Sequence, residues 1–126
     1  MRVILLPILA ALAAQPVAAY KNWDLYLFRP GCNPEDVDIG LYLYHRIGTQ
    51  KQACQRIDNL DFNLTDVDSL SWKSPVEERA QFDLCMFKDA KCNKRVIDEV
   101  RNQWDICHPY NGWKSYKVVP IGAACK

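Results

Sequence analysis

The sequence predicts an α+β domain, in which a mostly antiparallel β-sheet packs against one amphipathic helix and disulfides staple the two together. Three observations predict this fold. Several short segments alternate apolar and polar side chains, as half-buried strands do. Residues 93–104 instead carry apolar side chains at helical spacing. Six cysteines in a chain of 126 residues indicate a disulfide framework.

The first 19 residues have the pattern of a secretory signal peptide. Arg2 supplies a positive charge, an uncharged apolar run covers residues 3–14, and Val-Ala-Ala precedes Tyr20. The apolar run is too short to cross about 30 Å of hydrocarbon, so we expect no membrane span. We therefore expect cleavage before Tyr20, secretion, and one disulfide-rich domain over residues 20–126.

Five segments are expected to form strands. Each combines β-branched or aromatic residues with alternating polarity and is bounded by turn residues. The expected strands are residues 22–28, 41–47, 68–73, 80–87 and 113–119. Residues 54–57 fit either a short strand or one helical turn. Within the second strand, alternation places His45 on the face of Leu41 and Leu43, which favours a buried or half-buried histidine.

Apolar spacing favours a helix over residues 93–104. Four side chains line one side of it: Val96, Ile97, Val100 and Trp104. Asn93 is an acceptable N-cap. The alternative is a strand, which β-branched residues favour, but a strand would place Ile97 and Glu99 on one face beside Arg101. We prefer the helix.

The six cysteines are Cys32, Cys54, Cys85, Cys92, Cys107 and Cys125. Binding of a metal by Cys85, Cys92, Cys107 and His108 is the competing interpretation. Their C-x6-C and C-x14-C spacings differ from the C-x2-C of zinc sites, so we expect three disulfides and no metal.

Six cysteines allow 15 connectivities, among which the sequence does not choose. The preferred pairing is Cys32–Cys85, Cys54–Cys107 and Cys92–Cys125. It closes long loops, which restrict the unfolded chain most, and it avoids a bridge between the two ends of the expected helix.

Charge is distributed unevenly along the chain. Residues 20–70 carry 5 basic and 8 acidic side chains, whereas residues 71–126 carry 10 basic and 7 acidic ones. This asymmetry is too small to predict a nucleic-acid partner. The sequon Asn63-Leu64-Thr65 favours a surface position and a glycan for Asn63.

Taken together, the expected signal peptide, the cysteines and several sequence segments resemble those of the small cysteine-rich proteins that filamentous fungi secrete. Many of those proteins are candidate effectors or virulence factors. The resemblance covers most of residues 22–125. It is carried by the expected signal peptide, WDLYLF at 23–28, ACQ at 53–55, FDLCMFKDAKC at 82–92 and GWKSYKVV at 112–119. It implies secretion and a stapled β-rich fold, and it carries over no catalytic residue.

The sequence assembles no enzymatic site. His45 beside Arg46, with Glu77 or Glu78 brought close, is the one candidate for ribonuclease-like acid–base chemistry. His108, between Cys107 and Pro109, favours a turn. No nucleophile elbow, phosphate loop or His-Glu-x-x-His motif is present, so we expect neither an enzyme nor a cofactor.

The sequence supports ligand binding better than catalysis, because the chain carries many aromatic residues: 4 Trp, 6 Tyr and 4 Phe. Trp72, Trp113 and Tyr110 lie near expected turns, where an exposed ring suits a sugar or a protein partner. We therefore expect a non-enzymatic, effector-like protein that binds a host or competitor protein or glycan outside the cell. The alternatives are a ribonuclease-like or hydrolytic toxin and a structural protein of a wall or matrix.

Overall fold

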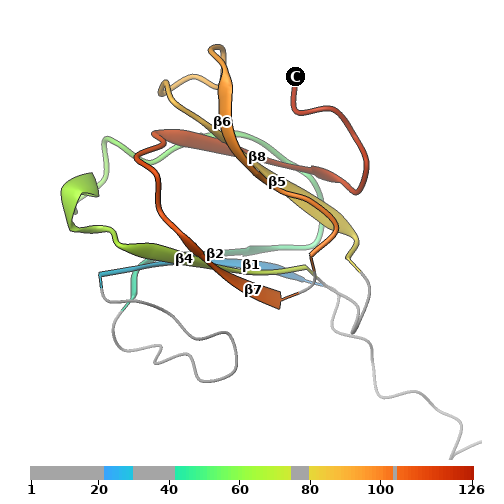
Figure 1. Cartoon of the computed structure of the whole chain (residues 1–126), viewed down its shortest axis with the longest axis horizontal. Coiled ribbons are helices and arrows are strands. Elements are labelled where there is room, and N and C mark those ends of the chain that lie inside the picture. Colours follow the sequence, from blue (N-terminus) through green and yellow to red (C-terminus); the bar gives the residue numbers. More distant parts are fainter. Residues whose placement is uncertain (1–21, 30–41, 75–79, 104) are drawn as a thin grey trace, which may run out of the picture.

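The protein is a β-sandwich of two antiparallel sheets (Figure 1). This computed structural model describes residues 22–29, 42–74, 80–103 and 105–126. The strands in chain order are β1 (Trp23–Phe28), β2 (Tyr42–Gly48), β3 (Gln52–Arg56), β4 (Ser69–Lys73), β5 (Phe82–Phe87), β6 (Val96–Val100), β7 (Asp105–Pro109) and β8 (Ser115–Pro120). One short 3-10 helix, η3 (Leu64–Asp66), precedes β4.

The chain changes sheet repeatedly, so both sheets are built from strands far apart in sequence. Sheet A has the order β2-β1-β4-β7 and sheet B the order β3-β8-β5-β6. In Figure 1, sheet A forms the lower layer and sheet B the upper one. Every paired neighbour is antiparallel. The first and last strands, β1 and β8, lie in different sheets.

The core lies between the two sheets and follows from the alternation of each strand. Inward-facing residues include Trp23, Leu25, Leu27, Leu70 and Trp72 from sheet A and Leu84, Met86, Tyr116 and Val118 from sheet B, all less than 3% exposed. Burying each large apolar side chain contributes about 1.5–3 kcal/mol. The layers also meet through a polar contact, because the hydroxyls of Tyr44 and Tyr116 lie 2.9 Å apart. Burial raises the pKa of both phenols, which therefore remain neutral.

A second apolar cluster covers the outer face of sheet B. Cys85 and Phe87 of β5 face outward there and pack with Cys92 and Cys125. Two disulfides hold this layer: Cys54–Cys92, with Cα atoms 5.8 Å apart, and Cys85–Cys125, with Cα atoms 5.7 Å apart. The C-terminal tail therefore lies on the face of sheet B that points away from sheet A, above the upper layer in Figure 1.

A buried carboxylate secures the same tail. Asp83 of β5 is 1% exposed and accepts hydrogen bonds from the backbone N–H groups of Asn102 and Gly122, both at 2.9 Å. Its third donor is the Arg101 guanidinium, at 2.8 Å, which also donates to the Ala123 carbonyl at 2.6 Å. One side chain thus joins the end of β6 to the tail.

The expected α+β fold is wrong, because the described part of the expected helix, residues 93–103, forms no helix. Val96–Val100 forms β6, which pairs with β5 so that Leu84 faces Val100. The β-branched residues of this segment, Val96, Ile97 and Val100, have low helix propensity and are well suited to a strand that pairs with β5. Asn102, with φ 52°, turns the chain just after the strand. Trp104 lies outside the described residues. The sequence argued against a strand because a strand would place Glu99 beside Arg101. The structure contains this contact, since Glu99 accepts a hydrogen bond from Arg101 at 2.8 Å.

The expected strands correspond to β1, β2, β4, β5 and β8, and the undecided segment 54–57 overlaps β3. Two strands were not anticipated, β6 and β7. His108 lies within β7 and not in a turn. The buried residue of β2 is Tyr44, whereas His45 faces the opposite side of the sheet and is half-buried.

The preferred cysteine pairing is also wrong. Cys54 bonds Cys92 and Cys85 bonds Cys125, so Cys32–Cys85, Cys54–Cys107 and Cys92–Cys125 cannot form. The tail lies over β5 and the β5–β6 turn lies beside β3, and this proximity decides the pairing more than loop length does. Cys107 is disulfide-bonded too, and no described cysteine is free. Cys32 and the expected signal peptide, residues 1–19, lie outside the described residues.

Replacing Asp83 by Ala is expected to lower the free energy of unfolding by about 2 kcal/mol or more, because the half-buried Arg101 guanidinium and two N–H groups lose their acceptor. Glu99→Gln is the matched control: Glu99 contacts the same Arg101 but its side chain is 43% exposed, so the loss stays below about 1 kcal/mol. Urea unfolding of both variants measures the difference, and equal losses would contradict the role of Asp83.

Non-reducing peptide mapping of the folded protein is expected to yield a Cys54–Cys92 peptide and a Cys85–Cys125 peptide. Reduction should release both, and no thiol should titrate before it. A Cys92–Cys125 peptide would overturn the packing described for the outer face of sheet B.

Candidate functional site

The structure removes two of the three aromatic residues expected to bind a ligand. Trp72 and Trp113 are each 0% exposed and belong to the core. Tyr110 is half-buried; its ring packs 5.3 Å from that of Trp113, and its hydroxyl donates to the Trp113 carbonyl. Burial, and then the nearby Asp58 charge, raises the pKa of Tyr110. The two tryptophan rings therefore stabilise the sandwich and offer no platform at its surface, whereas part of the Tyr110 side chain stays exposed.

The two histidines each contact an aspartate. His45 Nε2 bonds Asp24 Oδ1, and its ring stacks on Tyr26 with centroids 4.0 Å apart. His108 Nε2 lies 2.7 Å from Asp98 Oδ2, which links β7 to β6 and so joins the edges of the two sheets. Glu77 and Glu78, the expected partners of His45, lie outside the described residues.

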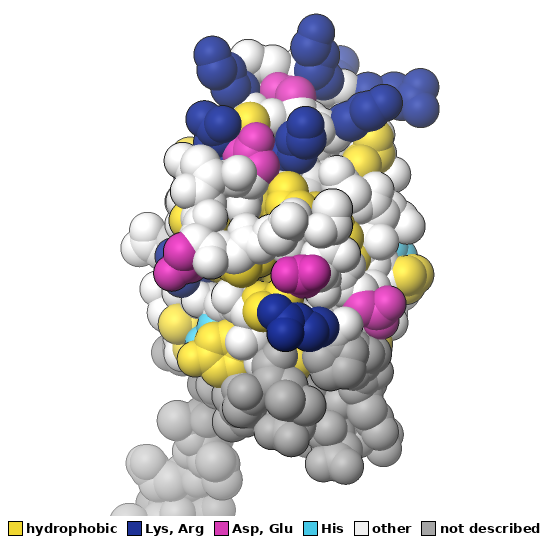
Figure 2. Space-filling view, turned by 90° about the vertical axis from the view of Figure 1, so that its left-hand side faces the viewer, with side chains coloured by type: hydrophobic (Ala, Val, Ile, Leu, Met, Phe, Trp, Pro, Cys, Tyr) yellow, Lys and Arg dark blue, Asp and Glu magenta, His cyan; other side chains and the backbone are white. Residues whose placement is uncertain are grey.

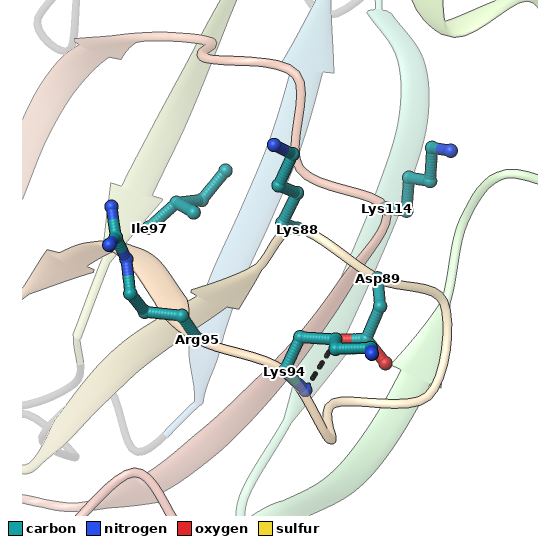
Figure 3. Close-up of a pocket in the computed structure, with 6 residues that line it drawn as sticks. All are labelled: Lys88, Asp89, Lys94, Arg95, Ile97 and Lys114. Atoms are coloured by element: carbon teal, nitrogen blue, oxygen red, sulfur yellow. Dashed lines mark hydrogen bonds between the residues drawn. The ribbon is translucent and has the colours of Figure 1, made fainter.

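A basic pocket is the most distinctive surface feature that the described residues form. Its volume is about 580 Å³, within the usual range for ligand sites. Six residues line it (Figure 3): Lys88, Asp89, Lys94, Arg95, Ile97 and Lys114. They come from the β5–β6 connection, from β6 and from the residue before β8. Figure 2 shows Lys and Arg side chains gathered at one end of the molecule, opposite the grey residues.

Asp89 shapes the backbone of the basic pocket. Its carboxylate accepts hydrogen bonds from the N–H groups of Lys91 at 3.0 Å, Asn93 at 3.1 Å and Lys94 at 2.8 Å. Desolvation acts to raise the pKa of Asp89, but these backbone donors together outweigh it and leave the pKa below its usual value. The one acid of the pocket is therefore ionised and already occupied.

Further contacts hold the β5–β6 connection against its neighbours. The Ser115 hydroxyl accepts from the Cys92 N–H at 3.1 Å and donates to the Asp89 carbonyl at 2.5 Å. The Lys114 N–H donates to the Phe87 carbonyl at 2.9 Å, and the Cys54–Cys92 disulfide ties the connection to β3. Cys92 adopts φ 55°, the left-handed turn that these contacts impose. The pocket is thus a fixed backbone that carries long cationic side chains.

Four cations without an ion-pair partner among the described residues give the pocket a positive surface. The Arg56 hydrogen bond and then the nearby charge of Lys114 lower the pKa of Asp58, so this acid lies near the pocket. Lys88, Lys94, Arg95 and Lys114 are exposed, and none forms an ion pair with another residue that the structure describes. Lysine supplies point charges, and the arginine guanidinium matches the two oxygens of a carboxylate or phosphate. Ile97 gives the pocket a half-buried apolar surface. This arrangement suits the binding of a negatively charged group.

A second hollow, the loop pocket, adjoins the basic pocket. Its volume is about 560 Å³, and it is lined by Asp58, Leu60, Asp61, Phe62, Asn63, Leu64 and Lys114. Lys114 borders both pockets. Asn63 is exposed and caps η3, with its side-chain oxygen accepting from the Thr65 N–H at 3.0 Å. Glycosylation at Asn63 stays a prediction.

No group of His, Cys, Asp and Glu suited to a metal ion occurs among the described residues. Within the same ranges, no helix is long and apolar enough to span a membrane. Comparison with protein-family models, with curated proteins and with solved structures found no match.

The sequence held one signal for the basic pocket, the excess of basic residues after residue 70. KDAKCNKR at 88–95 concentrates that excess in eight residues. Only residues 93–95 of this segment belong to the expected helix, and no site was predicted from its cations. Lys114 joins them only because β8 lies beside β5, which no local pattern indicates.

Replacing Asp89 by Ala should destabilise the protein at neutral pH, because three N–H donors of the β5–β6 connection lose their acceptor. The pKa of Asp89 is lowered on folding, so its contribution is present above its unfolded value, about 3.9, and is lost as the pH falls through the folded value. Urea unfolding should therefore separate wild type from variant at pH 7 and less so near pH 3.

Asp61→Ala is the control, since Asp61 is exposed and accepts no hydrogen bond from the described residues. It should match wild type at both pH values. A difference between wild type and Asp89→Ala that grew with acidity would contradict the assignment.

Proposed function

We propose that this protein is a secreted, effector-like protein of the fungal cysteine-rich type, which binds a host or competitor protein or glycan and catalyses no reaction. The basic pocket is the observation that carries the proposal. It presents four cations that form no ion pair with any described residue, on a backbone fixed by a disulfide and by Asp89. Fixed geometry lowers the entropy that a binding site loses when its ligand arrives.

The disulfides support the extracellular part of the proposal. Bridges such as Cys54–Cys92 and Cys85–Cys125 persist in oxidising compartments and are rare in the cytosol. The expected signal peptide, residues 1–19, supports it independently. A stapled outer layer over sheet B also suits a small protein that acts without chaperones outside the cell.

One observation favours the hydrolytic alternative, the His45–Asp24 contact. A histidine oriented by a carboxylate is part of a general-base arrangement. His45 lies on sheet A, however, whereas the cations of the basic pocket surround β5 and β6 of sheet B. A phosphate held by those cations would not meet the imidazole, so we keep binding as the proposed function.

Immobilised protein incubated with extracellular fluid and wall polysaccharides should retain a partner through the basic pocket. The variant Lys94→Glu/Arg95→Glu should lose that partner, because two attractive charges become repulsive. The variant Lys51→Glu/Lys126→Glu changes the net charge equally at exposed positions that do not line the pocket, and it should keep the partner.

Retention of the same partner by both double variants would contradict the proposed site. The hydrolytic alternative has its own readout. Degradation of RNA or polysaccharide by wild type, abolished in His45→Ala, would replace binding with catalysis as the function.

A further inference from the structure

The basic pocket and the loop pocket are neighbours, because Lys114 lines both. Each has a volume above 500 Å³, about 580 Å³ and about 560 Å³. A ligand that fills the basic pocket and extends past Lys114 enters the loop pocket. We call the two together the shared groove.

The halves of the shared groove differ in chemistry. The basic half holds four cations and the already occupied Asp89. The loop half presents Leu60, Phe62 and Leu64, each half-buried with part of its apolar surface accessible. Its two acids differ: Asp58 is paired with Arg56, whereas Asp61 is exposed. A matching ligand carries separated carboxylates, which the basic half can bind, and exposes apolar faces between them for the loop half.

We propose that the shared groove binds an anionic glycan built of uronate sugars. This inference rests on the proposed function and narrows it to one ligand class. A uronate chain carries one carboxylate per sugar, which Arg95 and the lysines of the basic half can bind as charge-assisted hydrogen-bond donors. Its C–H faces match the Phe62 ring and the two leucines of the loop half.

The same groove suits other polyanions less well. Recognition of single-stranded nucleic acid uses several aromatic side chains on which bases stack, whereas the residues lining the shared groove include one aromatic ring, Phe62. A densely sulfated chain would bring more than one charge per sugar against Asp61 in the loop half, where a uronate chain brings one. The chain as a whole carries a net charge of only +1, so a general attraction to polyanions is weak.

The test is titration of the protein with polygalacturonate and with the same polymer fully methyl-esterified, which keeps the sugar backbone and removes the charge. Wild type should bind the acid form and not the ester, and raising the salt concentration from about 50 to 500 mM should weaken binding. Lys94→Glu/Arg95→Glu should weaken it roughly tenfold or more, whereas Lys51→Glu/Lys126→Glu should leave it within about twofold. Thermal unfolding of both variants confirms that they are folded.

Chain length separates the shared groove from the basic pocket alone. Oligogalacturonates long enough to pass Lys114 should bind more tightly than a disaccharide, and Leu60→Ser should reduce that gain while leaving the disaccharide unchanged. Equal binding of acid and ester, or tighter binding of a DNA oligonucleotide or of dextran sulfate, would overturn the uronate inference. In those cases a partner lost by Lys94→Glu/Arg95→Glu would still support the proposed function, so the two failures are distinguishable.

Discussion

The outer face of sheet B must be covered, and the buried carboxylate of Asp83 is the contact on which that cover depends. An aspartate that is 1% exposed is tolerable only when its charge is balanced and its oxygens accept hydrogen bonds. Arg101, Asn102 and Gly122 meet these conditions. Because these donors come from the end of β6 and from the tail, satisfying one carboxylate positions both. The same tail places Cys125 beside Cys85, and the disulfide between them adds a covalent link to this contact.

The basic pocket is the second consequence of covering sheet B. The β5–β6 connection has to turn back over Phe87 and place Cys92 beside Cys54. Asp89 organises that turn from within by accepting three backbone N–H groups, so no cation of the connection is needed to neutralise it through a direct ion pair. The lysines and Arg95 are left facing solvent. The hydrogen bonds by which Asp89 forms this turn therefore leave a positively charged surface.

The contacts of Asp83 and Asp89, which stabilise the fold, do not involve the cationic side-chain groups of the basic pocket. Asp83 is buried and paired with a cation, whereas Asp89 is bound by neutral donors beside cations that remain available. Substitutions at Lys94 or Arg95 change exposed side chains and leave both hydrogen-bond networks in place. The charge of this surface can therefore change while the sandwich and its disulfides remain.

The sequence by itself determined most of the strands and the oxidised state of the described cysteines. Alternation in WDLYLF and FDLCMF is strong because one side of each strand faces the core, so period two is visible locally. It did not determine β6, because the order Val96, Ile97, Val100 satisfies helical spacing as well as a strand with a bulge where Met86 and Phe87 meet it. Pairing with β5 decided between the two.

Tertiary structure alone decided the site, the cysteine pairing and the fate of the aromatic residues. Trp72 and Trp113 lie at segment ends that suggested exposure, yet the second sheet buries them, and no local pattern reports which face another layer will cover. Cysteine pairing and the meeting of Lys114 with Lys88 likewise depend on strand order across sheet B. Composition and periodicity are properties of neighbouring residues, whereas these outcomes are contacts between residues far apart in the chain, so only the packed sheets specify them.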